Sequence, residues 1–529
     1  MADAVVIGAG PNGLVAANLL ADAGWDVLVL EEQPEPGGAV RSGETAHPGF
    51  VHDRFSSFYP LVAASPVFRA LELERHGLRL RRNEAALAHP LPEGRAALIY
   101  GDLDRTCAGL DALSPGDGEA FARWMAYWER IGPPLIDALM SPFPPLRGAA
   151  RLGAALRTPA AFGELARLGV LPVRRFGEEE LSGEGARLLF AANALHADFA
   201  PESPGGAVYG LVLVGMAQQV GFPAVEGGSG QLTAALVRRL EAAGGRLECG
   251  VRAERVLLRG GRAAAVRTAD GRRHAARRAV LADVGAPQLY EDLVGLEHLP
   301  ARLRAGLRRF QYDPGTVKVD WALRGPVPWS APEVARAGTV HVAESVDALT
   351  LAMAQLATRL VPARPFLVAG QHARMDPTRQ PPGAETFWAY THVPQAIRGD
   401  AGGDEIRGRW DEREREAFAD RMEAEVERLA PGFRERVAGR HVMPPPELEA
   451  QNANLVGGAI NGGTAQLHQQ LVLRPVPGLG RAATPVPGLF LASASAHPGG
   501  GVHGACGANA ARAALRARWT GALRRPLRA

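Results

Sequence analysis

The sequence AVVIGAGPNG at residues 4–13 decides the fold of the N-terminal part of this chain. Its first four residues are apolar, which predicts a short buried strand of a parallel sheet over Ala4–Ile7. The glycine motif follows at once, and the Ala- and Leu-rich stretch Leu14–Ala23 predicts a helix. A glycine-rich turn between a strand and a helix is typical of a dinucleotide-binding fold.

The spacing of the glycines assigns a role to each of them. Gly8 allows the tight turn, Gly10 lets the backbone approach a pyrophosphate, and Gly13 lets the helix pack closely on the strand. The N-terminus of the helix offers free N–H groups and partial positive charge to phosphates. A second buried strand, Trp25–Leu30, ends at Glu31, whose carboxylate is placed to accept hydrogen bonds from ribose hydroxyls. These residues predict a bound dinucleotide.

A glycine pair lies just after the second strand. Gly37 and Gly38 would let the loop pass close beneath the cofactor, and Arg41 would offset pyrophosphate charge as a bidentate donor. In isolation this stretch is equally consistent with a plain turn and a solvated arginine.

A second glycine site near the other end of the chain decides between the cofactors. Residues 488–492 predict a buried strand, and a turn that contains Gly499-Gly500-Gly501-Val502 and Gly504 leads into a helix over Ala508–Arg518. Consecutive glycines suit a backbone that lies flat against a planar ring, and a helix N-terminus stabilises the anionic edge of a reduced flavin. A nicotinamide nucleotide would need neither glycine site, so we predict FAD.

Together these motifs resemble those of the phytoene desaturase-related flavoproteins. The resemblance rests on the N-terminal motif, the glycine pair, VEGGSG at 225–230 and AHPGGG at 496–501, and it extends from residue 2 to about residue 516. The group includes bacterial phytoene desaturases, carotenoid isomerases, retinol saturases and the pyridine nucleotide-disulfide oxidoreductase domain-containing protein 2 type, and the chain is more similar to the last type than to true phytoene desaturases. The resemblance implies FAD but no particular substrate.

The resemblance also has consequences for single residues. It implies that the backbone around Arg255 and Val256 meets the adenine. Flavin amine oxidases usually have an arginine directly after the glycine pair, where this chain has Ala39, and an acid for the ribityl chain where it has Ala494. Backbone groups or Ser495 would take over the role of that acid. The residues that we expect to bind the cofactor are Gly8, Gly10, Gly13, Glu31, Gly37, Gly38, Arg41, Val256, Ser495, Gly500, Gly501, Val502 and Gly504.

The expected architecture is α/β, with two domains. A Rossmann-like FAD-binding domain of the glutathione reductase type would be built from the discontinuous segments 1–75, 221–300 and 451–529. Residues 76–220 and 301–450 would form a substrate domain of mixed sheet and helices. A chain of 529 residues exceeds the roughly 250–300 residues at which one core stops growing, which favours this division.

Several further elements follow from periodicity. Arg246–Cys249, Arg252–Leu258 and Ala264–Thr268 predict a three-stranded meander after the helix that begins at Gly228. Alternation over Thr316–Leu323 predicts a strand, and the charge-laced Glu412–Leu429 predicts an amphipathic outer helix.

Composition excludes several function classes. The net charge of +3 comes from arginine spread along the chain, which indicates no nucleic-acid surface. The three cysteines lie far apart, so we expect no metal site, no flavin–disulfide relay and a reducing compartment. No apolar stretch reaches the ~18 residues of a membrane span, and no signal peptide is visible. We expect a soluble, cytoplasmic protein. The aromatic, leucine and arginine residues mixed over 121–175 fit a buried helical layer or a lid that dips into lipid, so peripheral membrane contact stays open.

Two side chains are candidates for a catalytic role. Lys318 is the only lysine of the chain. It would lie over the flavin and hold a water, oxygen or a substrate group. The alternatives are that it forms a surface ion pair with Asp320, or that a lysine occurs here by chance. His503 follows the triple glycine and would lie near the ring, or would only cap backbone. Cys506, at a helix start, is expected to pack.

The leading hypothesis is an FAD-dependent dehydrogenase, desaturase or oxidase that removes hydride from a C–H or C–N site of an organic substrate, including lipophilic or carotenoid-like ones. One alternative is a redox-neutral isomerase or a saturase of a polyene. Another is a flavin-bound interaction protein with little catalysis. The substrate, the electron acceptor (oxygen or a quinone) and the oligomeric state stay open at this point.

Overall fold

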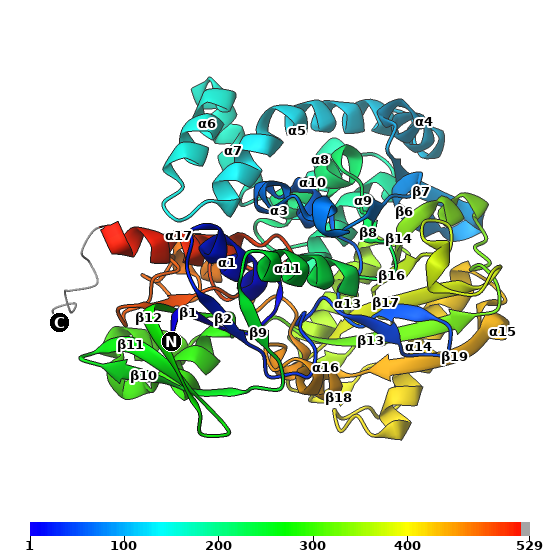
Figure 1. Cartoon of the computed structure of the whole chain (residues 1–529). Coiled ribbons are helices and arrows are strands. Elements are labelled where there is room, and N and C mark those ends of the chain that lie inside the picture. The colour runs from blue at the N-terminus through cyan, green and yellow to red at the C-terminus, as the bar shows by residue number, and fades with distance from the viewer. Residues whose placement is uncertain (520–529) are drawn as a thin grey trace.

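The computed structural model describes residues 1–519, and it contains two large sheets (Figure 1). In the first sheet, five parallel strands run in the order β9-β2-β1-β12-β20, and β10 and β11 extend β12 as an antiparallel meander. The strands are β1 (Ala2–Ile7), β2 (Val27–Leu30), β9 (Arg246–Glu248), β10 (Ala253–Arg259), β11 (Arg262–Thr268), β12 (Arg273–Ala282) and β20 (Leu489–Leu491). Strands from the beginning, the middle and the end of the chain therefore share one sheet.

Both faces of the parallel strands are covered. Val6 and Leu281 lie in one apolar cluster with the helices α1 (Pro11–Asp22), α11 (Gly230–Ala242) and α17 (Ala505–Trp519). Alternate residues such as Val5 and Val280 belong to a second cluster with the meander and with residues 286–307. Burial on both faces explains why these strands are continuously apolar.

The second sheet is mixed, in the order β19-β13-β17-β16-β14-β6-β7, and only β14 and β6 pair in parallel. Its strands are β6 (Ala85–Leu91), β7 (Arg95–Tyr100), β13 (Gly315–Leu323), β14 (Ala337–Val342), β16 (Leu367–Gln371), β17 (Glu385–Val393) and β19 (Val437–Met443). Helix α14 (Glu412–Leu429) packs on one face, in an apolar cluster with alternate residues of the strands.

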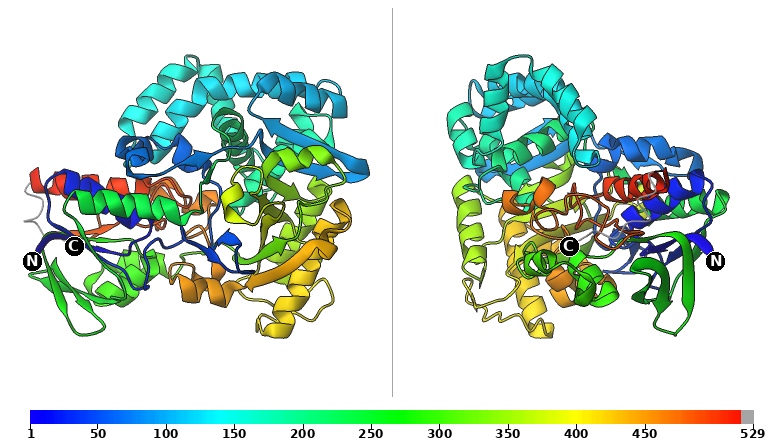
Figure 2. Two further views of the ribbon diagram at one scale, coloured as in Figure 1. Left: turned by 45° about the vertical axis from the view of Figure 1, so that its right-hand side comes forward. Right: turned by 90° about the vertical axis from the view of Figure 1, so that its left-hand side faces the viewer.

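A layer of helices lies on the same side of the molecule in both views of Figure 2, above the two sheets. It consists of α4 (Leu103–Leu113), α5 (Asp117–Met140), α6 (Leu146–Leu156), α7 (Pro159–Leu168), α8 (Val173–Glu180), α9 (Glu184–Ala194) and α10 (Gly206–Gln219). Its core includes Trp128, Phe176 and Phe190, and this core continues onto Leu87 and Val368 of the second sheet.

Shorter elements connect these parts. The strands are β3 (Ser42–Glu44), β4 (Val51–Asp53), β5 (Leu80–Arg81), β8 (Ala224–Val225), β15 (Leu360–Val361) and β18 (Gly399–Asp400). The helices are α2 (Pro60–Ala64), α3 (Pro66–Leu71), α12 (Ala301–Leu307), α13 (Val346–Ala357), α15 (Phe433–Arg436) and α16 (Pro445–Gln451). No helix among residues 1–519 combines the length and the apolar character that a membrane crossing requires.

The predicted Rossmann-like α/β fold is confirmed, but one predicted strand pairing is wrong. Arg246–Glu248 (β9) does not belong to the meander; it extends the parallel sheet beside β2. The meander consists of β10, β11 and the first half of β12 instead. The domain boundaries stay a prediction, and residues 520–529 of the last predicted segment lie outside the described residues.

A buried ion-pair network joins segments that are far apart in the sequence. Arg379 donates to Asp53 at 2.7 Å, to Asp376 at 2.9 Å and to the backbone oxygen of Val225 at 2.6 Å. Asp53 also accepts from the backbone N–H of Ser229, at the start of α11. Burial alone would raise the pKa of Asp53, but the charge of Arg379 outweighs it and lowers that pKa. The network thus connects the hairpin β3–β4 to the loop after β16.

We expect the substitution Arg379→Met to destabilise the protein by about 3–5 kcal/mol, because two buried carboxylates would lose their partner. The measurement is thermal and urea unfolding of the FAD-loaded protein. The control is Arg105→Met, because Arg105 forms an exposed ion pair with Glu84 that contributes little. Equal melting temperatures for the two variants would contradict the assignment.

Candidate active site and cofactor cradle

The N-terminus of α1 is built from closely packed glycine backbone. Gly8 has a φ of +92°, and a Cβ on Gly13 would stand 2.1 Å from the backbone oxygen of Gly8. Helix α1 begins at Pro11, and its N-cap residue Gly10 has no side chain to satisfy the first N–H groups. These groups point to the edge of the sheet where β1, β2 and β12 end, which suits a phosphate.

Asp283 is a further functional candidate, and it lies at the same edge of the sheet. It directly follows β12, and its carboxylate accepts a hydrogen bond from the N–H of Gly13 at 2.8 Å. Burial raises the pKa of Asp283 to about 7, and the negative charge of Glu31 adds to the shift. Asn454 fixes the backbone here, because it donates to the Asp283 oxygen and accepts from Gly285 N–H. An acid therefore lies beside the predicted pyrophosphate position.

Glu31 lies at the same edge, as its place after β2 predicts. Its carboxylate accepts from the N–H of Ala9 at 2.6 Å and from the N–H of Gln33 at 2.9 Å. Burial raises the pKa of Glu31, although these two hydrogen bonds oppose the rise. The backbone oxygen of Glu31 accepts from Val251, just before β10, and Val256 of that strand has a buried side chain in the meander. The first glycine loop and the meander are thus both fixed to Glu31.

The glycine pair packs directly against the first glycine motif. The N–H of Gly37 donates to the backbone oxygen of Ala9 at 2.9 Å. A Cβ on Gly38 would stand 3.1 Å from the Cα of Gly10, so a larger residue would push the loop away from the cradle. Arg41 donates to the backbone oxygens of Gly38 and Gln451, and its guanidinium lies over a phenyl ring. Arg41 therefore holds the glycine pair in place from one side.

The second glycine turn is stabilised by the His503 ring. Its Nε2 donates to the backbone oxygen of Gly499 at 3.2 Å, and its Nδ1 accepts from the N–H of Ala505 at 3.0 Å, at the start of α17. Burial lowers the pKa of His503 to about 4, so the ring is neutral. Both ring nitrogens are engaged by backbone, which favours the capping alternative; a catalytic role of His503 stays a prediction. Val502 packs beside the α1 cluster.

The other residues of this turn lie close to backbone or packed side chains. Gly501 and Gly504 have φ values of +102° and +69°, which favour glycine. Ser495 donates through its hydroxyl to the backbone oxygen of Gly462 at 2.8 Å. Burial raises the pKa of Cys506 to about 12, and its thiol donates to two backbone oxygens, as a packing role requires.

Asn461 is a candidate that the sequence analysis missed. Its side chain lies against Gly500, because a Cβ on that glycine would stand 2.7 Å from Asn461 Oδ1. Asp313 accepts from the N–H of Asn461, and the fully buried Arg474 donates to its backbone oxygen at 2.7 Å. Nδ2 of Asn461 is buried and has no partner in residues 1–519. An unsatisfied donor therefore lies beside the glycine turn, where a cofactor oxygen or nitrogen would satisfy it.

Lys318 lies at the contact between the second sheet and the hairpin that follows the glycine pair. Its ammonium group pairs with Asp320 and stands 5.8 Å from the centre of the Trp388 ring. Asp320 also accepts from the hydroxyl of Thr45, in the β3–β4 hairpin, at 2.9 Å. The expected pair with Asp320 is present, but it is not at the surface, since the two side chains are only 3% and 0% exposed.

These residues fit a bound dinucleotide. The cradle combines helix N–H groups without a capping side chain, glycines at which a Cβ would collide, and an unsatisfied amide beside the second turn. The fold alone does not distinguish FAD from other dinucleotides. The relatives of the chain decide between these cofactors.

The comparisons with known proteins cover nearly the whole chain. Residues 6–71 match the model of the NAD(P)-binding Rossmann-like domain. Phytoene desaturase (lycopene-forming) of Pseudescherichia vulneris is 25% identical over 526 residues, which cover 97% of this chain and 99% of that protein. Pyridine nucleotide-disulfide oxidoreductase domain-containing protein 2 of Mus musculus is 30% identical over 559 residues, which cover 97% and 93%. The chain belongs to this phytoene desaturase-related family. It is an FAD-dependent oxidoreductase.

The solved structures support the same fold for this phytoene desaturase-related oxidoreductase. The crystal structure of an oxidoreductase from Methanosarcina mazei has a TM-score of 0.62 at 17% sequence identity, and the match covers 97% of this chain and 99% of that one. At this identity, the match shows the fold and not the reaction.

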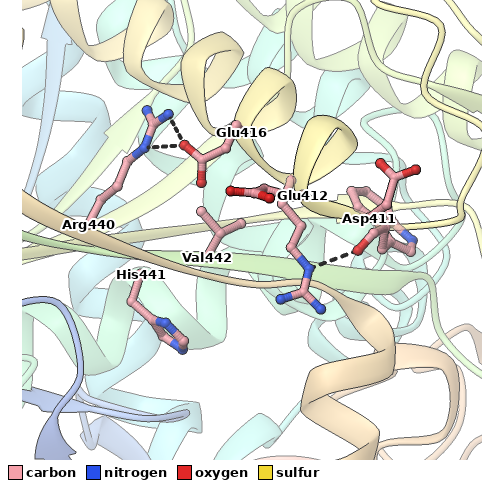
Figure 3. Close-up of a pocket in the computed structure, with 8 residues that line it drawn as sticks. Asp411, Glu412, Glu416, Arg440, His441 and Val442 are labelled. Carbon is pink, nitrogen blue, oxygen red and sulfur yellow. Dashed lines mark hydrogen bonds and ion pairs between the residues drawn. The ribbon is translucent and has the colours of Figure 1, made fainter.

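A surface pocket of about 400 Å³ lies away from the cradle of the phytoene desaturase-related oxidoreductase, between α14 and β19 (Figure 3). Arg440 and Glu416 form an ion pair on its wall, and Arg415 donates to the backbone oxygen of Trp410. None of its lining residues belongs to the glycine cradle. We assign it no role in the reaction.

The FAD affinity of this phytoene desaturase-related oxidoreductase should fall as pH rises through about 7. Below this value the Asp283 carboxyl is neutral, and above it the carboxylate repels the pyrophosphate. We expect FAD to bind at least about fivefold more weakly at about pH 8.5 than at about pH 6, measured by quenching of FAD fluorescence.

The variant Asp283→Asn should remove this pH dependence, since the amide keeps an acceptor for Gly13 but cannot ionise. Asp270→Asn, at an exposed turn of the meander, is the matched control and should retain the dependence. A pH-independent affinity of the unmodified protein would refute the role of Asp283.

Proposed function

We propose that the protein removes a hydride from a C–H or C–N site of an organic substrate, as a dehydrogenase, desaturase or oxidase. Oxygen or a quinone would accept the electrons afterwards. Bound FAD supplies the hydride acceptor, and the protein supplies binding, orientation and electrostatics. The proposal rests chiefly on Lys318, a buried lysine on the sheet face that meets the cofactor-binding segments.

The position of Lys318 supports a role in orienting the reacting group. The strand β13 alternates, so that Val317 and Val319 enter the apolar core on the α14 side while Lys318 and Asp320 lie on the other face. Asp320 pairs with the ammonium group and accepts from Thr45, which ties the pair to the hairpin that follows the glycine pair. A charge kept in this place at a desolvation cost is more than packing requires. We propose that Lys318 holds a water, oxygen or a substrate group near the flavin.

We propose the following placement of FAD. Glu31 would bind the ribose, the N-terminus of α1 would bind the pyrophosphate with Arg41 near it, and the backbone at Val256 would meet the adenine. The turn at Gly500–Gly504 would lie against the ring, with the N-terminus of α17 at its anionic edge. Support comes from the contacts of the glycine pair with Ala9 and Gly10, and from the contact of Gly507 in α17 with Asn12 in α1.

The proposed domain division is supported by the strand membership of the two sheets. Residues 1–75, 221–300 and 451–519 contain the strands of the first sheet, and residues 76–220 and 301–450 contain those of the second. The second unit would bind the substrate.

Anaerobic mixing of the FAD-loaded protein with a panel of candidate substrates tests the reaction. Bleaching of the flavin absorbance supports hydride removal. Double-bond movement that occurs only after prior reduction of the flavin would indicate the isomerase or saturase alternative. Absence of any response across the panel would favour the flavin-bound interaction protein.

The substitution Lys318→Met should lower turnover by about a hundredfold without releasing FAD, because the ammonium group contacts the reacting site and not the cradle. Turnover and the FAD content, read from absorbance, are measured on the same sample. Lys318→Arg keeps the charge and should retain more of the activity. Unchanged turnover of Lys318→Met would remove the proposed role.

We also propose peripheral contact with a membrane through the tips of α6 and α7, which lie at the outer edge of the helical layer (Figure 1). Leu146 and Phe162 are 74% and 52% exposed there, and Val170 is exposed beyond α7. Arg147 and Arg151 lie beside them on α6. Exposed apolar side chains flanked by arginines are typical of helices that bind anionic lipid surfaces.

Liposome flotation tests this contact. The unmodified protein should float with anionic vesicles, and the double variant Leu146→Asp, Phe162→Asp should stay in the dense fraction, because it loses buried apolar area and gains negative charge. Leu351→Asp on α13, where the leucine is 60% exposed, is the control and should still float. A protein left wholly in the dense fraction would refute the contact.

A further inference from the structure

The two faces of the second sheet differ in polarity. The face beneath α14 is apolar, with residues such as Val319, Val340 and Ala369. The opposite face, here called the polar face, lies toward α9, α10 and the short helix η3 (Leu195–Ala197), and it carries histidine, threonine, lysine and tryptophan side chains. Leu87 and Val368 of this face belong to the core of the helical layer, so the face carries polar and apolar side chains together.

Strand register places the polar side chains in line. Lys318 of β13 pairs with Tyr390 of β17, which pairs with Val368 of β16, which pairs with His341 of β14. His89 of β6 comes next, with its ring 6.2 Å from that of His341. Four strand spacings give the row a length of about 19 Å. It begins at the lysine that we place near the flavin and runs away from it.

Five polar atoms of this face are buried and have no hydrogen-bond partner anywhere in residues 1–519. They are Nδ1 of His89, Oγ1 of Thr339, Nδ1 of His341, Nε1 of Trp388 and Nε2 of His392. Each unpaired buried group costs free energy, and five on one face would use up a large part of the stability of a domain. A bound molecule with hydrogen-bonding groups would satisfy them.

The chemistry of the five atoms defines that partner. Trp388 offers an N–H donor. His89 donates through Nε2 to the backbone oxygen of Ala343, which leaves its Nδ1 as an acceptor. The hydroxyl of Thr339 can donate or accept a hydrogen bond. Donors and acceptors on one face suit hydroxyl or carbonyl oxygens, and the aromatic rings between them suit an apolar body.

The face has no free charge to offer. Burial lowers the pKa of His89 and His392 to about 4 and that of His341 well below its usual value, so these rings are neutral. The ammonium group of Lys318 is already neutralised by Asp320. No cluster of His, Cys, Asp and Glu within residues 1–519 is arranged to hold a metal ion. A carboxylate or phosphate ligand would find no counter-charge here.

We propose that the polar face binds the substrate, and that the substrate is an uncharged, oxygen-bearing lipophilic molecule, with hydroxyl or carbonyl groups along an apolar body of up to about 19 Å. This rests on the proposed function for the place of the reaction. The oxygen atoms bind the unpaired groups of the face, while the apolar body lies between Trp388, Tyr390 and the helical layer. A pure hydrocarbon polyene leaves these groups unsatisfied and is disfavoured.

A matched set of ten-carbon isoprenoids tests the substrate class. The FAD-loaded protein is dialysed to equilibrium against myrcene (a hydrocarbon), geraniol (an alcohol), citral (an aldehyde) and geranate (a carboxylate). Geraniol and citral should bind at least about tenfold more tightly than myrcene and geranate. Equal binding of myrcene, tightest binding of geranate, or no binding of any probe overturns the proposal. Dialysis needs no turnover, so the result is independent of whether a hydride is transferred.

Two isosteric variants separate a ligand role from a structural one. Thr339→Val removes an unpaired hydroxyl, so it should weaken geraniol binding by about fivefold while leaving the melting temperature unchanged or raised. Thr386→Val is the matched control, because the Thr386 hydroxyl donates to Gln380 at 2.9 Å inside the protein. It should lower the melting temperature and leave geraniol binding unchanged. A lower melting temperature of Thr339→Val with unaltered geraniol binding overturns the proposal.

Discussion

Contact between backbones at the N-terminus of α1 is the constraint on which the rest of the structure depends. Segments from both ends of the chain meet there at distances that leave no room for side chains: a Cβ on Gly13 would stand 2.1 Å from the Gly8 oxygen, and one on Gly507 would stand 1.9 Å from the Asn12 oxygen. Glycine is therefore required where α1 packs on β1 and where α17 packs on α1. The glycine pair and Asp283 are positioned against the same point, so the geometry of the cradle follows from these contacts.

The hairpin β3–β4 links this cradle to the polar face of the second sheet. It directly follows Arg41, and from its two ends it sends Thr45 to Asp320 and Asp53 to Arg379. A single short segment thus contacts the cofactor loop, the lysine and the buried ion-pair network.

Local patterns predicted those parts of the fold that local physics determines. The amphipathic helix Glu412–Leu429 has the predicted bounds, and the strand predicted over Thr316–Leu323 begins one residue earlier. The meander prediction was wrong at Arg246–Cys249, because a short strand with mixed polarity does not reveal whether its neighbour is parallel or antiparallel. Asn461 was missed for a similar reason: its significance comes from Gly500 and Arg474, which only the tertiary structure brings to it.

Strand β20 lies beside β12 in the first sheet, and this position has a consequence for synthesis. This strand and α17 are among the last described elements of the chain, yet they complete a sheet that begins with β1. Pairings between the two ends of a chain close the largest loops and form late. β12 would keep an open edge until β20 has been synthesised, whereas the helical layer can assemble earlier. FAD would then be acquired only after β20 and α17 have been synthesised.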